Sequence, residues 1–136
     1  MRVRYNTKEV DLLARIMRAE ALGEGIFGMK LVGNVVVNRV VYNCKPFVKI
    51  NTITKAVLQK NQFEGTTISL FNARASTAEK RRAMECIKFW RADPANKALY
   101  FQNPGKGKSC KKDWYGVLVG RFKNHCFYNP EKLCNL

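Results

Sequence analysis

The sequence predicts an α+β fold, with helices over the N-terminal two-thirds and a small antiparallel sheet in the C-terminal third. Two observations predict it. Apolar residues recur at helical spacing up to about residue 91, and short β-prone segments separated by Gly, Pro and Asn follow from residue 98 onward. The chain has 136 residues, enough for one domain with its own core, and no linker or internal repeat divides it. We therefore assign residues 1–136 to a single domain.

The first predicted helix begins after a cap at Asn6 and stops at Gly23. Apolar residues form one face of this helix, at Val10, Leu13, Ala14, Met17 and Ala21. Glu20 is an acid on the same face and lies in the last turn, where the helix dipole disfavours a negative charge. Desolvation acts in the same direction, so Glu20 is a candidate proton donor. The alternative is a helix-end glutamate that turns into solvent or pairs with Arg15 or Arg39.

A second helix is predicted from residue 27 to about residue 42, in a segment that is apolar on nearly all sides. Its content of valine would also suit a buried strand, but its length favours a helix. Asn34 and Asn38 are four residues apart and would share one face of this helix. They either bond to each other or to a neighbouring loop, or they contact a substrate.

The remaining elements are shorter. A helix is predicted near residues 53–59, and Ser76 with Glu79 forms a capping box that opens a helix to about Arg91, ended by Asp93-Pro94. Short strands are predicted around residues 99–101, 117–119 and 126–128, with a turn or loop at 103–107.

The charge balance points to an anionic partner. The chain has 25 basic and 10 acidic residues, a net charge of +15. Nucleic acid, an acidic membrane surface and peptidoglycan with its peptide carboxylates would all satisfy this charge. We expect the excess Lys and Arg, including the cluster Lys106, Lys108, Lys111 and Lys112, to hold the protein on such a partner. We do not expect a cation close to Glu20, because it would weaken Glu20 as an acid.

Membrane insertion and export signals are not expected. No apolar run approaches the length of a membrane span, and charges interrupt every apolar run in the first twenty residues, which therefore do not resemble a secretory signal.

The five cysteines do not indicate a metal site or a disulfide framework. The chain has no Cys-x-x-Cys motif and one histidine, so we expect no structural zinc and no cofactor. Cys86 falls in a helical pattern and is expected to be buried. Cys110, Cys126 and Cys134 cluster near the end of the chain, where one disulfide among them or cross-linking to other chains both stay open.

Several sequence blocks in a fixed order resemble the SleB/CwlJ family of cell-wall hydrolases, the spore-cortex-lytic enzymes. These blocks are Ala-Glu-Ala-Leu-Gly-Glu-Gly at 19–25, the apolar segment 31–40, Gln-Phe-Glu at 62–64, Leu-Tyr-Phe-x-Asn-Pro at 99–104 and Asn-His-Cys-Phe-Tyr at 124–128. The short chain, the Asn43-Cys44 pair and the His-Cys-Phe-Tyr-Asn-Pro ending look most like the CwlJ branch. The resemblance runs from about residue 10 to about residue 130.

This resemblance implies a lysozyme-like catalytic domain that cleaves peptidoglycan glycan strands of the spore cortex during germination. The catalytic acid/base of the family matches Glu20. The chemistry would be that of a lytic transglycosylase, which needs one carboxyl group, or of a muramidase-type hydrolase, which usually uses two. The expected substrate-binding residues are Gln62, Glu64, Tyr100, Asn103, Trp114 and His125. For the aromatic residues the alternative is core packing, and for His125 it is a structural hydrogen bond.

The resemblance also implies a location and partners. Proteins of the spore coat are made in the mother-cell cytoplasm without a signal peptide, so we expect this one at the coat or the cortex–coat boundary. Its partners would be cortex glycan and a spore-coat protein, with no specific nucleic acid. The alternative is a basic binding or coat structural protein without catalytic activity; the positive charge favours it, but no recognised nucleic-acid motif supports it.

Overall fold

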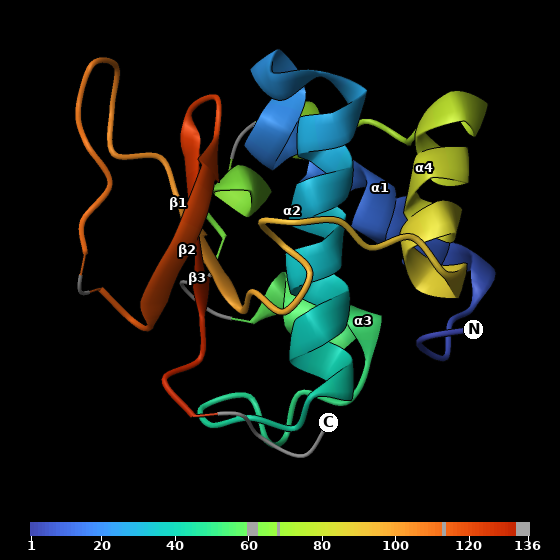
Figure 1. Ribbon diagram of the computed structural model, residues 1–136. Coiled ribbons are helices and arrows are strands. Elements are labelled where there is room, and N and C mark those ends of the chain that lie inside the picture. Colours follow the sequence, from blue (N-terminus) through green and yellow to red (C-terminus); the bar gives the residue numbers. More distant parts are fainter. Residues whose placement is uncertain (60–62, 68, 113, 133–136) are drawn as a thin grey trace.

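The computed structural model of the chain describes residues 1–59, 63–67, 69–112 and 114–132, without the side chains of Leu22 and Glu64. Helices pack together on one side, and an antiparallel sheet stands beside them (Figure 1). The helical elements are α1 (Thr7–Ala21), η1 (Leu22–Glu24), α2 (Gly25–Val41), α3 (Ile53–Leu58), η2 (Glu64–Thr67), η3 (Ser69–Phe71) and α4 (Thr77–Lys88). The strands are β1 (Tyr100–Gln102), β2 (Val117–Phe122) and β3 (His125–Asn129). The predicted α+β fold, with helices first and the sheet last, is confirmed.

Helix α1 begins where the sequence predicts. The side chain of Asn6 caps it by accepting the backbone N–H of Glu9 at 2.9 Å. The predicted apolar face is buried, at Val10, Leu13, Ala14, Met17 and Ala21. The helix ends at Ala21, just before the predicted stop, so Glu20 lies in its last turn as expected.

Helix α2 is the central element of the fold and is buried on nearly all sides (Figure 1). A glycine lets two other helices approach it closely, because a Cβ at Gly33 would lie 2.8 Å from Cys86 Sγ of α4 and 2.9 Å from Met17 Sδ of α1. Valines of α2 join the core shared with α1, while Leu31 and Val35 pack with Phe127 of β3. The helix therefore connects the helical layer to the sheet.

The two asparagines of α2 form hydrogen bonds to a neighbouring loop. Asn34 Nδ2 donates to the carbonyl of Trp90 at 2.7 Å, and Asn34 Oδ1 accepts the N–H of Ala92. Asn38 Nδ2 donates to the carbonyls of Ala95 at 3.0 Å and Ala98 at 2.8 Å. Both side chains thus bind the main chain of the segment between α4 and β1, as the loop interpretation predicts.

Helix α4 opens with the predicted capping box. Ser76 Oγ accepts the N–H of Glu79, and the Glu79 carboxylate accepts the N–H of Ser76. The prediction that this helix continues to about Arg91 is wrong, because it ends at Lys88. The hydrogen bonds that Asn34 makes to the main chain at 90 and 92 replace helical ones and draw the chain away from the helix axis.

The predicted strands form one sheet in the order β1-β3-β2, with both pairs antiparallel. Strand β3 lies between the other two, so that Phe127 faces Phe101 of β1 and Gly120 of β2. Strands β2 and β3 are joined by a tight turn, and β2 has an irregularity between Leu118 and Gly120. The start of β3 is thereby placed next to the end of β1.

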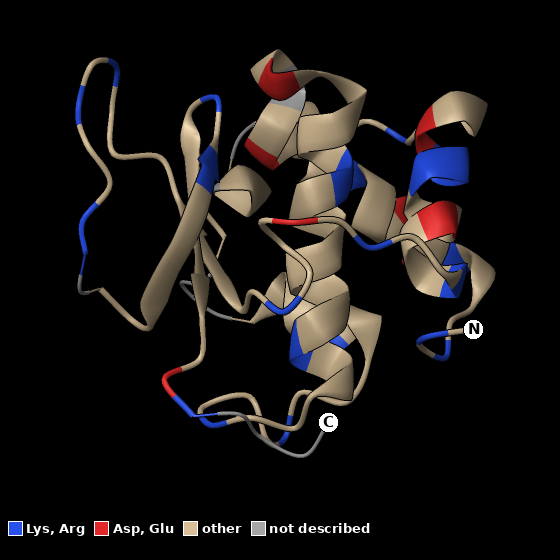
Figure 2. Ribbon diagram, viewed as in Figure 1, with Lys and Arg blue, Asp and Glu red and all other residues tan. Residues whose placement is uncertain are grey.

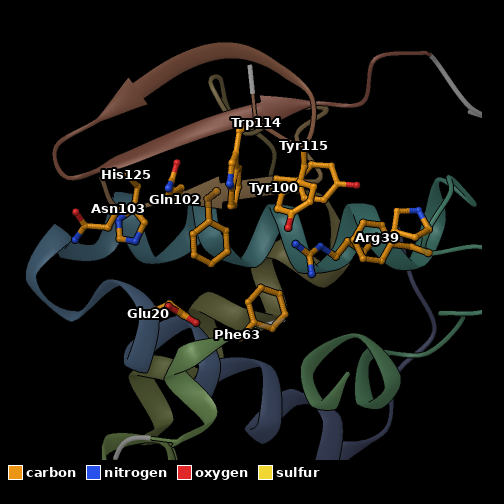
Figure 3. A pocket seen from close by; sticks show the side chains of 12 residues that line it. Glu20, Arg39, Phe63, Tyr100, Gln102, Asn103, Trp114, Tyr115 and His125 are labelled. Atoms are coloured by element: carbon orange, nitrogen blue, oxygen red, sulfur yellow. The ribbon is translucent and has the colours of Figure 1, made fainter. Parts of the chain in front are cut away.

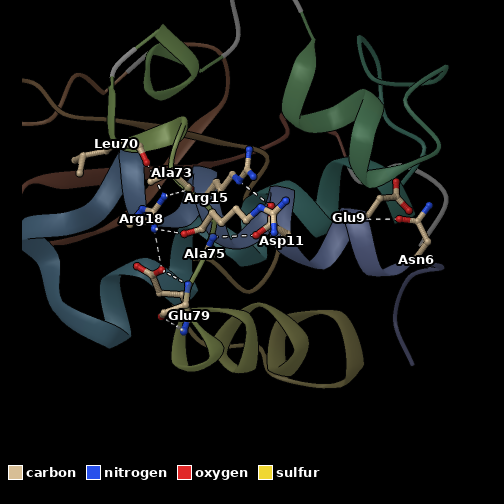
Figure 4. A network of polar contacts seen from close by, with 11 residues as sticks. Asn6, Glu9, Asp11, Arg15, Arg18, Leu70, Ala73, Ala75 and Glu79 are labelled. Carbon is tan, nitrogen blue, oxygen red and sulfur yellow. Dashed lines mark hydrogen bonds and ion pairs between the residues drawn. The ribbon is translucent and has the colours of Figure 1, made fainter.

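A polar network holds the segment before α4 against α1 (Figure 4). Arg18, which is 9% exposed, donates to the carbonyl of Leu70 at 2.6 Å and to the Glu79 carboxylate at 2.9 Å. Asp11 accepts the N–H of Ala75 at 2.9 Å. This segment includes η3 and follows η2, so the network fixes the main chain that passes the end of α1.

Positive charge is spread over the surface, with a run on the loop between β1 and β2 (Figure 2). The side chains of this run, Lys106, Lys108, Lys111 and Lys112, are all exposed. None of the helices in the described ranges has the length and apolar character needed to cross a membrane.

We expect the variant Asn38→Ala to lower the free energy of unfolding by about 1–3 kcal/mol, because it leaves buried carbonyls of the 95–98 segment without a donor. Urea denaturation measures this loss. The matched control is Asn72→Ala, whose side chain is exposed, and it should stay within about 0.5 kcal/mol of the wild type. Equal effects of the two changes would show that Asn38 does not hold the segment.

Candidate active site

A cleft of about 540 Å³ lies between the helical layer and the sheet (Figure 3). The end of α1 and part of α2 form one wall, and β1, the start of β3 and the loop before β2 form the other. The described residues that line it are Glu20, Arg39, Pro46, Phe47, Phe63, Tyr100, Phe101, Gln102, Asn103, Trp114, Tyr115 and His125.

Glu20 reaches the cleft from the last turn of α1 and is partly buried. Its Oε1 accepts the backbone N–H of Gly65 in η2 at 2.9 Å. A Cβ at Gly65 would lie 3.0 Å from Ala19 Cβ and 3.1 Å from Glu20 Cγ, closer than most Cβ contacts. The absence of a side chain at Gly65 therefore lets its N–H reach the carboxyl group.

Arg39 is a buried cation in the same cleft, 3% exposed, on an otherwise apolar stretch of α2. Its Nε donates to the carbonyl of Leu99 at 2.7 Å, and its guanidinium carbon lies 4.4 Å from the ring centre of Phe47. Burial lowers the pKa of Arg39 to about 10, an effect that the charges of Tyr100 and Glu20 partly oppose. At neutral pH Arg39 is thus a cation whose charge interacts with that of Glu20.

We expected no cation near Glu20, but Arg39 lines the same cleft and its charge interacts with that of Glu20. The Gly65 N–H and the Arg39 charge both favour the carboxylate form of Glu20, whereas the helix dipole and partial burial favour the neutral acid. Arg15, the other suggested partner of Glu20, pairs with Asp11 at 2.7 Å instead. The carboxyl group is therefore under opposing electrostatic influences.

Aromatic rings form the wall opposite Arg39 and Glu20. Tyr100 and Tyr115 stack with ring centres 5.5 Å apart, and Trp114 meets the Tyr115 ring edge-on at 4.7 Å. Tyr100 is buried, while Tyr115 is 65% exposed. Tyr100 is therefore packed in the core and also lines the cleft, while its contact with a substrate stays a prediction.

A disulfide fastens this wall to the sheet. Cys110, on the loop that carries Trp114, is bonded to Cys126 of β3. One disulfide among the three C-terminal cysteines was among the alternatives, and this pair confirms it. Cys44 is also disulfide-bonded, and Cys134 lies outside the described residues. Cys86 is fully buried as predicted, and burial raises the pKa of its thiol to about 12.

His125 lines the cleft at the first position of β3 and is 6% exposed. Its Nδ1 lies 2.6 Å from Oε1 of Glu24, a carboxyl group that is itself 3% exposed. Glu24 is therefore buried and is not among the described residues that line the cleft. It contacts the cleft through His125.

Most of the predicted site residues come together. Glu20, Tyr100, Asn103, Trp114 and His125 all line the one cleft. Their roles toward a ligand stay predictions. Gln62 lies outside the described residues, and of Glu64 only the main chain is described, at the start of η2.

The sequence reasoning missed Arg39 as a cleft residue, together with Phe63 and the backbone N–H of Gly65. A signal existed for Arg39, because a charged residue within the apolar segment that becomes α2 has to be buried with partners or to face a cavity. No signal existed for Gly65, since its N–H is brought to Glu20 by the path of the main chain.

Comparisons with known proteins agree with this geometry. The sequence profile of the cell wall hydrolase family matches residues 23–128. Proteins named cell wall hydrolase CwlJ from Oceanobacillus iheyensis and Bacillus subtilis are 47% and 43% identical, over 94% of this chain in each case and over 91% and 89% of the relatives. The catalytic domain of the germination-specific lytic transglycosylase SleB from Bacillus anthracis has the same lysozyme-like fold, with a TM-score of 0.73 and 23% identity, over 92% of this chain and 97% of that one.

We expect the variant Cys110→Ser to lower the free energy of unfolding by about 3 kcal/mol, because the lost bond closes a loop across a sequence separation of 16. Denaturation in urea gives the difference, and the exposed neighbour Ser109→Ala is the matched control. If alkylation without reductant modifies both Cys110 and Cys126 in the wild-type protein, the disulfide is not formed and this prediction is wrong.

Proposed function

This chain belongs to the cell wall hydrolase family, and we propose that it cleaves peptidoglycan glycan strands of the spore cortex during germination, with Glu20 as general acid and base. The observation that carries the proposal is the position of Glu20, which accepts the Gly65 N–H and shares with the Arg39 charge a cleft walled by aromatic rings. The names of the relatives support the substrate, and the contacts of Glu20 support its role.

The cleft suits a chain of sugar rings. Tyr100, Trp114 and Tyr115 offer flat faces for pyranose rings, and Gln102 and Asn103 offer amides for hydroxyl and acetamido groups. The cleft is also open at its aromatic end, where Tyr115 is exposed, so a polymer could extend beyond it.

We infer transglycosylase chemistry from the carboxyl groups. Among the described residues that line the cleft, Glu20 is the one carboxylic acid. In the first step Glu20 would protonate the oxygen of the leaving sugar as the glycosidic bond breaks. The Gly65 N–H and the Arg39 charge would stabilise the carboxylate that forms. This carboxylate would then take the proton of the C6 hydroxyl, whose oxygen attacks C1 of the same sugar and closes a 1,6-anhydro ring.

The excess positive charge would act outside the cleft. The exposed lysines on the loop between β1 and β2 would hold the enzyme on cortex carboxylates, at the coat or the cortex–coat boundary, beside a spore-coat partner. The same lysines, next to Trp114 and Tyr115, favour the second candidate, a basic binding or coat protein without catalytic activity. Turnover by the purified protein separates the two.

Replacing Glu20 by Gln should lower the release of soluble fragments from purified cortex by at least about 10²–10⁴-fold, because the amide keeps the shape but cannot transfer a proton. Mass spectrometry of the fragments from the wild-type enzyme should show 1,6-anhydro ends, each lighter by one water than a reducing end. Circular dichroism should show an unchanged fold in the variant.

A Glu20→Gln protein that retains wild-type activity would exclude the mechanism. Wild-type fragments with reducing ends alone would exclude the transglycosylase chemistry and require a second carboxyl group, for which Glu64 is the first candidate. The variant Glu64→Gln should then lose as much activity as Glu20→Gln.

The variant Gly65→Ala tests the contact between the backbone and the acid. The new methyl group would press on the Glu20 side chain at 3.1 Å and displace its carboxyl group, so turnover should fall by about tenfold to 100-fold. Gly23→Ala is the matched control near the same helix end, because a Cβ there meets nothing within 4 Å. If the two variants cleave cortex equally well, the position of Glu20 does not depend on Gly65.

A further inference from the structure

A buried carboxyl group outside the cleft touches the one histidine of the chain. Glu24 closes η1 and is 3% exposed, and its Oε1 lies 2.6 Å from Nδ1 of His125. The same oxygen accepts the backbone N–H of Asn124 at 2.9 Å. A buried charge is costly unless it is paired and hydrogen-bonded, so this pair has to be satisfied from within.

The residues packed around Glu24 and His125 leave room for the carboxyl group and hold the imidazole. A Cβ at Gly28 would lie 2.3 Å from Glu24 Cβ and 3.2 Å from the ring of Phe122, so the glycine makes room for the glutamate against β2. The imidazole is in turn held by Phe101, whose ring meets it edge-on with centres 5.4 Å apart. Both members of the pair are thereby fixed in orientation.

The hydrogen bonds assign the proton of the imidazole. Oε1 of Glu24 accepts the N–H of Asn124, and if Glu24 is an ionised carboxylate this oxygen is an acceptor toward His125 as well. The short contact with Nδ1 then requires a hydrogen on Nδ1. In the neutral ring this leaves a lone pair on Nε2, the remaining polar atom of a side chain that lines the cleft.

We propose that Glu24 is a positioning residue that fixes His125 in the Nδ1–H form, so that Nε2 accepts a hydrogen bond from a hydroxyl or acetamido N–H of the bound glycan. This inference rests on the proposed function, because it takes the ligand of the cleft to be a glycan. His125 extends from the sheet and Glu20 from the helical layer, so the two lie on opposite walls of the cleft (Figure 3), and a sugar bound between them would contact both.

A purely structural pair would not need this geometry. Oε2 of Glu24 is buried without a hydrogen-bond partner among the described residues, an arrangement that costs stability. A buried amide or apolar pair at this corner would avoid that cost. In return for this cost, the carboxylate fixes the imidazole in the Nδ1–H tautomer at the cleft. Without such a partner, an imidazole side chain in water favours the tautomer with the hydrogen on Nε2.

The single histidine makes the tautomer directly measurable by nitrogen-15 NMR of the imidazole ring. In the full-length wild-type protein at neutral pH, we expect a protonated Nδ1 and an unprotonated Nε2. Addition of a soluble disaccharide-peptide fragment of peptidoglycan should shift the Nε2 signal. In Glu24→Ala the ring should revert toward the Nε2–H form. The control Glu9→Gln, which alters a buried carboxyl group on the far part of α1, should leave the signals and turnover unchanged.

Turnover on cortex supplies the second readout. Glu24→Ala and His125→Ala should each lower kcat/KM by about tenfold, the effect of one lost hydrogen bond to the ligand. The double variant should lose no more than the worse single one, because both changes remove the same contact. Glu24→Gln, which keeps an oxygen acceptor for Nδ1–H, should recover part of the activity even if Glu24→Ala folds poorly.

Four results would overturn the inference: a wild-type ring with its hydrogen on Nε2, a ring protonated on both nitrogens at the working pH, an Nε2 signal unchanged by the fragment, or additive losses in the double variant. A wild-type protein that releases no fragments would instead overturn the proposed function, whatever the tautomer. If the wild type cleaves cortex and the Glu24 and His125 variants cleave it as well as the wild type does, the proposed function stands and this inference fails.

Discussion

Helix α2 holds the segment that leads into the sheet through hydrogen bonds from its own polar side chains. Asn34, Asn38 and Arg39 bind main-chain groups at residues 90, 92, 95, 98 and 99, immediately before β1. That segment has no regular secondary structure, so its buried carbonyls depend on these donors. The position of β1 follows from them, and β3 and β2 follow from β1 through sheet pairing. The strand that carries Tyr100 of the aromatic wall is thus positioned by one helix, while the disulfide holds the loop that carries Trp114.

The opposite wall depends on a second set of buried polar contacts. Arg18 binds the main chain of η3 and Asp11 that of the segment between η3 and α4, and this holds the nearby η2 against the end of α1. The result is that a backbone N–H of η2 meets Glu20. These two sets of buried polar contacts differ from the hydrophobic core in how firmly they fix the main chain around the site. Apolar packing tolerates shifts of the packed surfaces, whereas hydrogen bonds to named carbonyls fix the main chain that carries the cleft residues.

The limits of sequence prediction follow from the same contacts. Helices α1, α2 and α3 and the capped start of α4 were predictable because periodicity, length and a capping box are local in sequence. The end of α4 was not, because Asn34, more than fifty residues away, decides it. Glu20 could be identified as a candidate site residue from its place on an apolar face and from the family resemblance. The apolar segment around Arg39 indicated that its charge is buried or faces a cavity, but the partners of Arg39 and Glu24 could not be predicted, since a buried charge reveals its partner only once the chain is folded.

In the mechanism that we propose, the surroundings of Glu20 would let one carboxyl group serve both halves of a glycosidic cleavage. A site that favoured the neutral acid alone would donate a proton well but form a poorly stabilised carboxylate, and one that favoured the carboxylate alone would lack the proton at the start. Partial burial and the helix end oppose the charge of Glu20, and Gly65 and Arg39 support it. Arg39 is itself held by Leu99 and by aromatic rings, so it supports Glu20 from a fixed position. A flexible surface lysine could not do so, since solvent would screen it. The proposed mechanism therefore gives the positive charge of the chain two separate uses, an exposed one on the loops and a buried one at the acid.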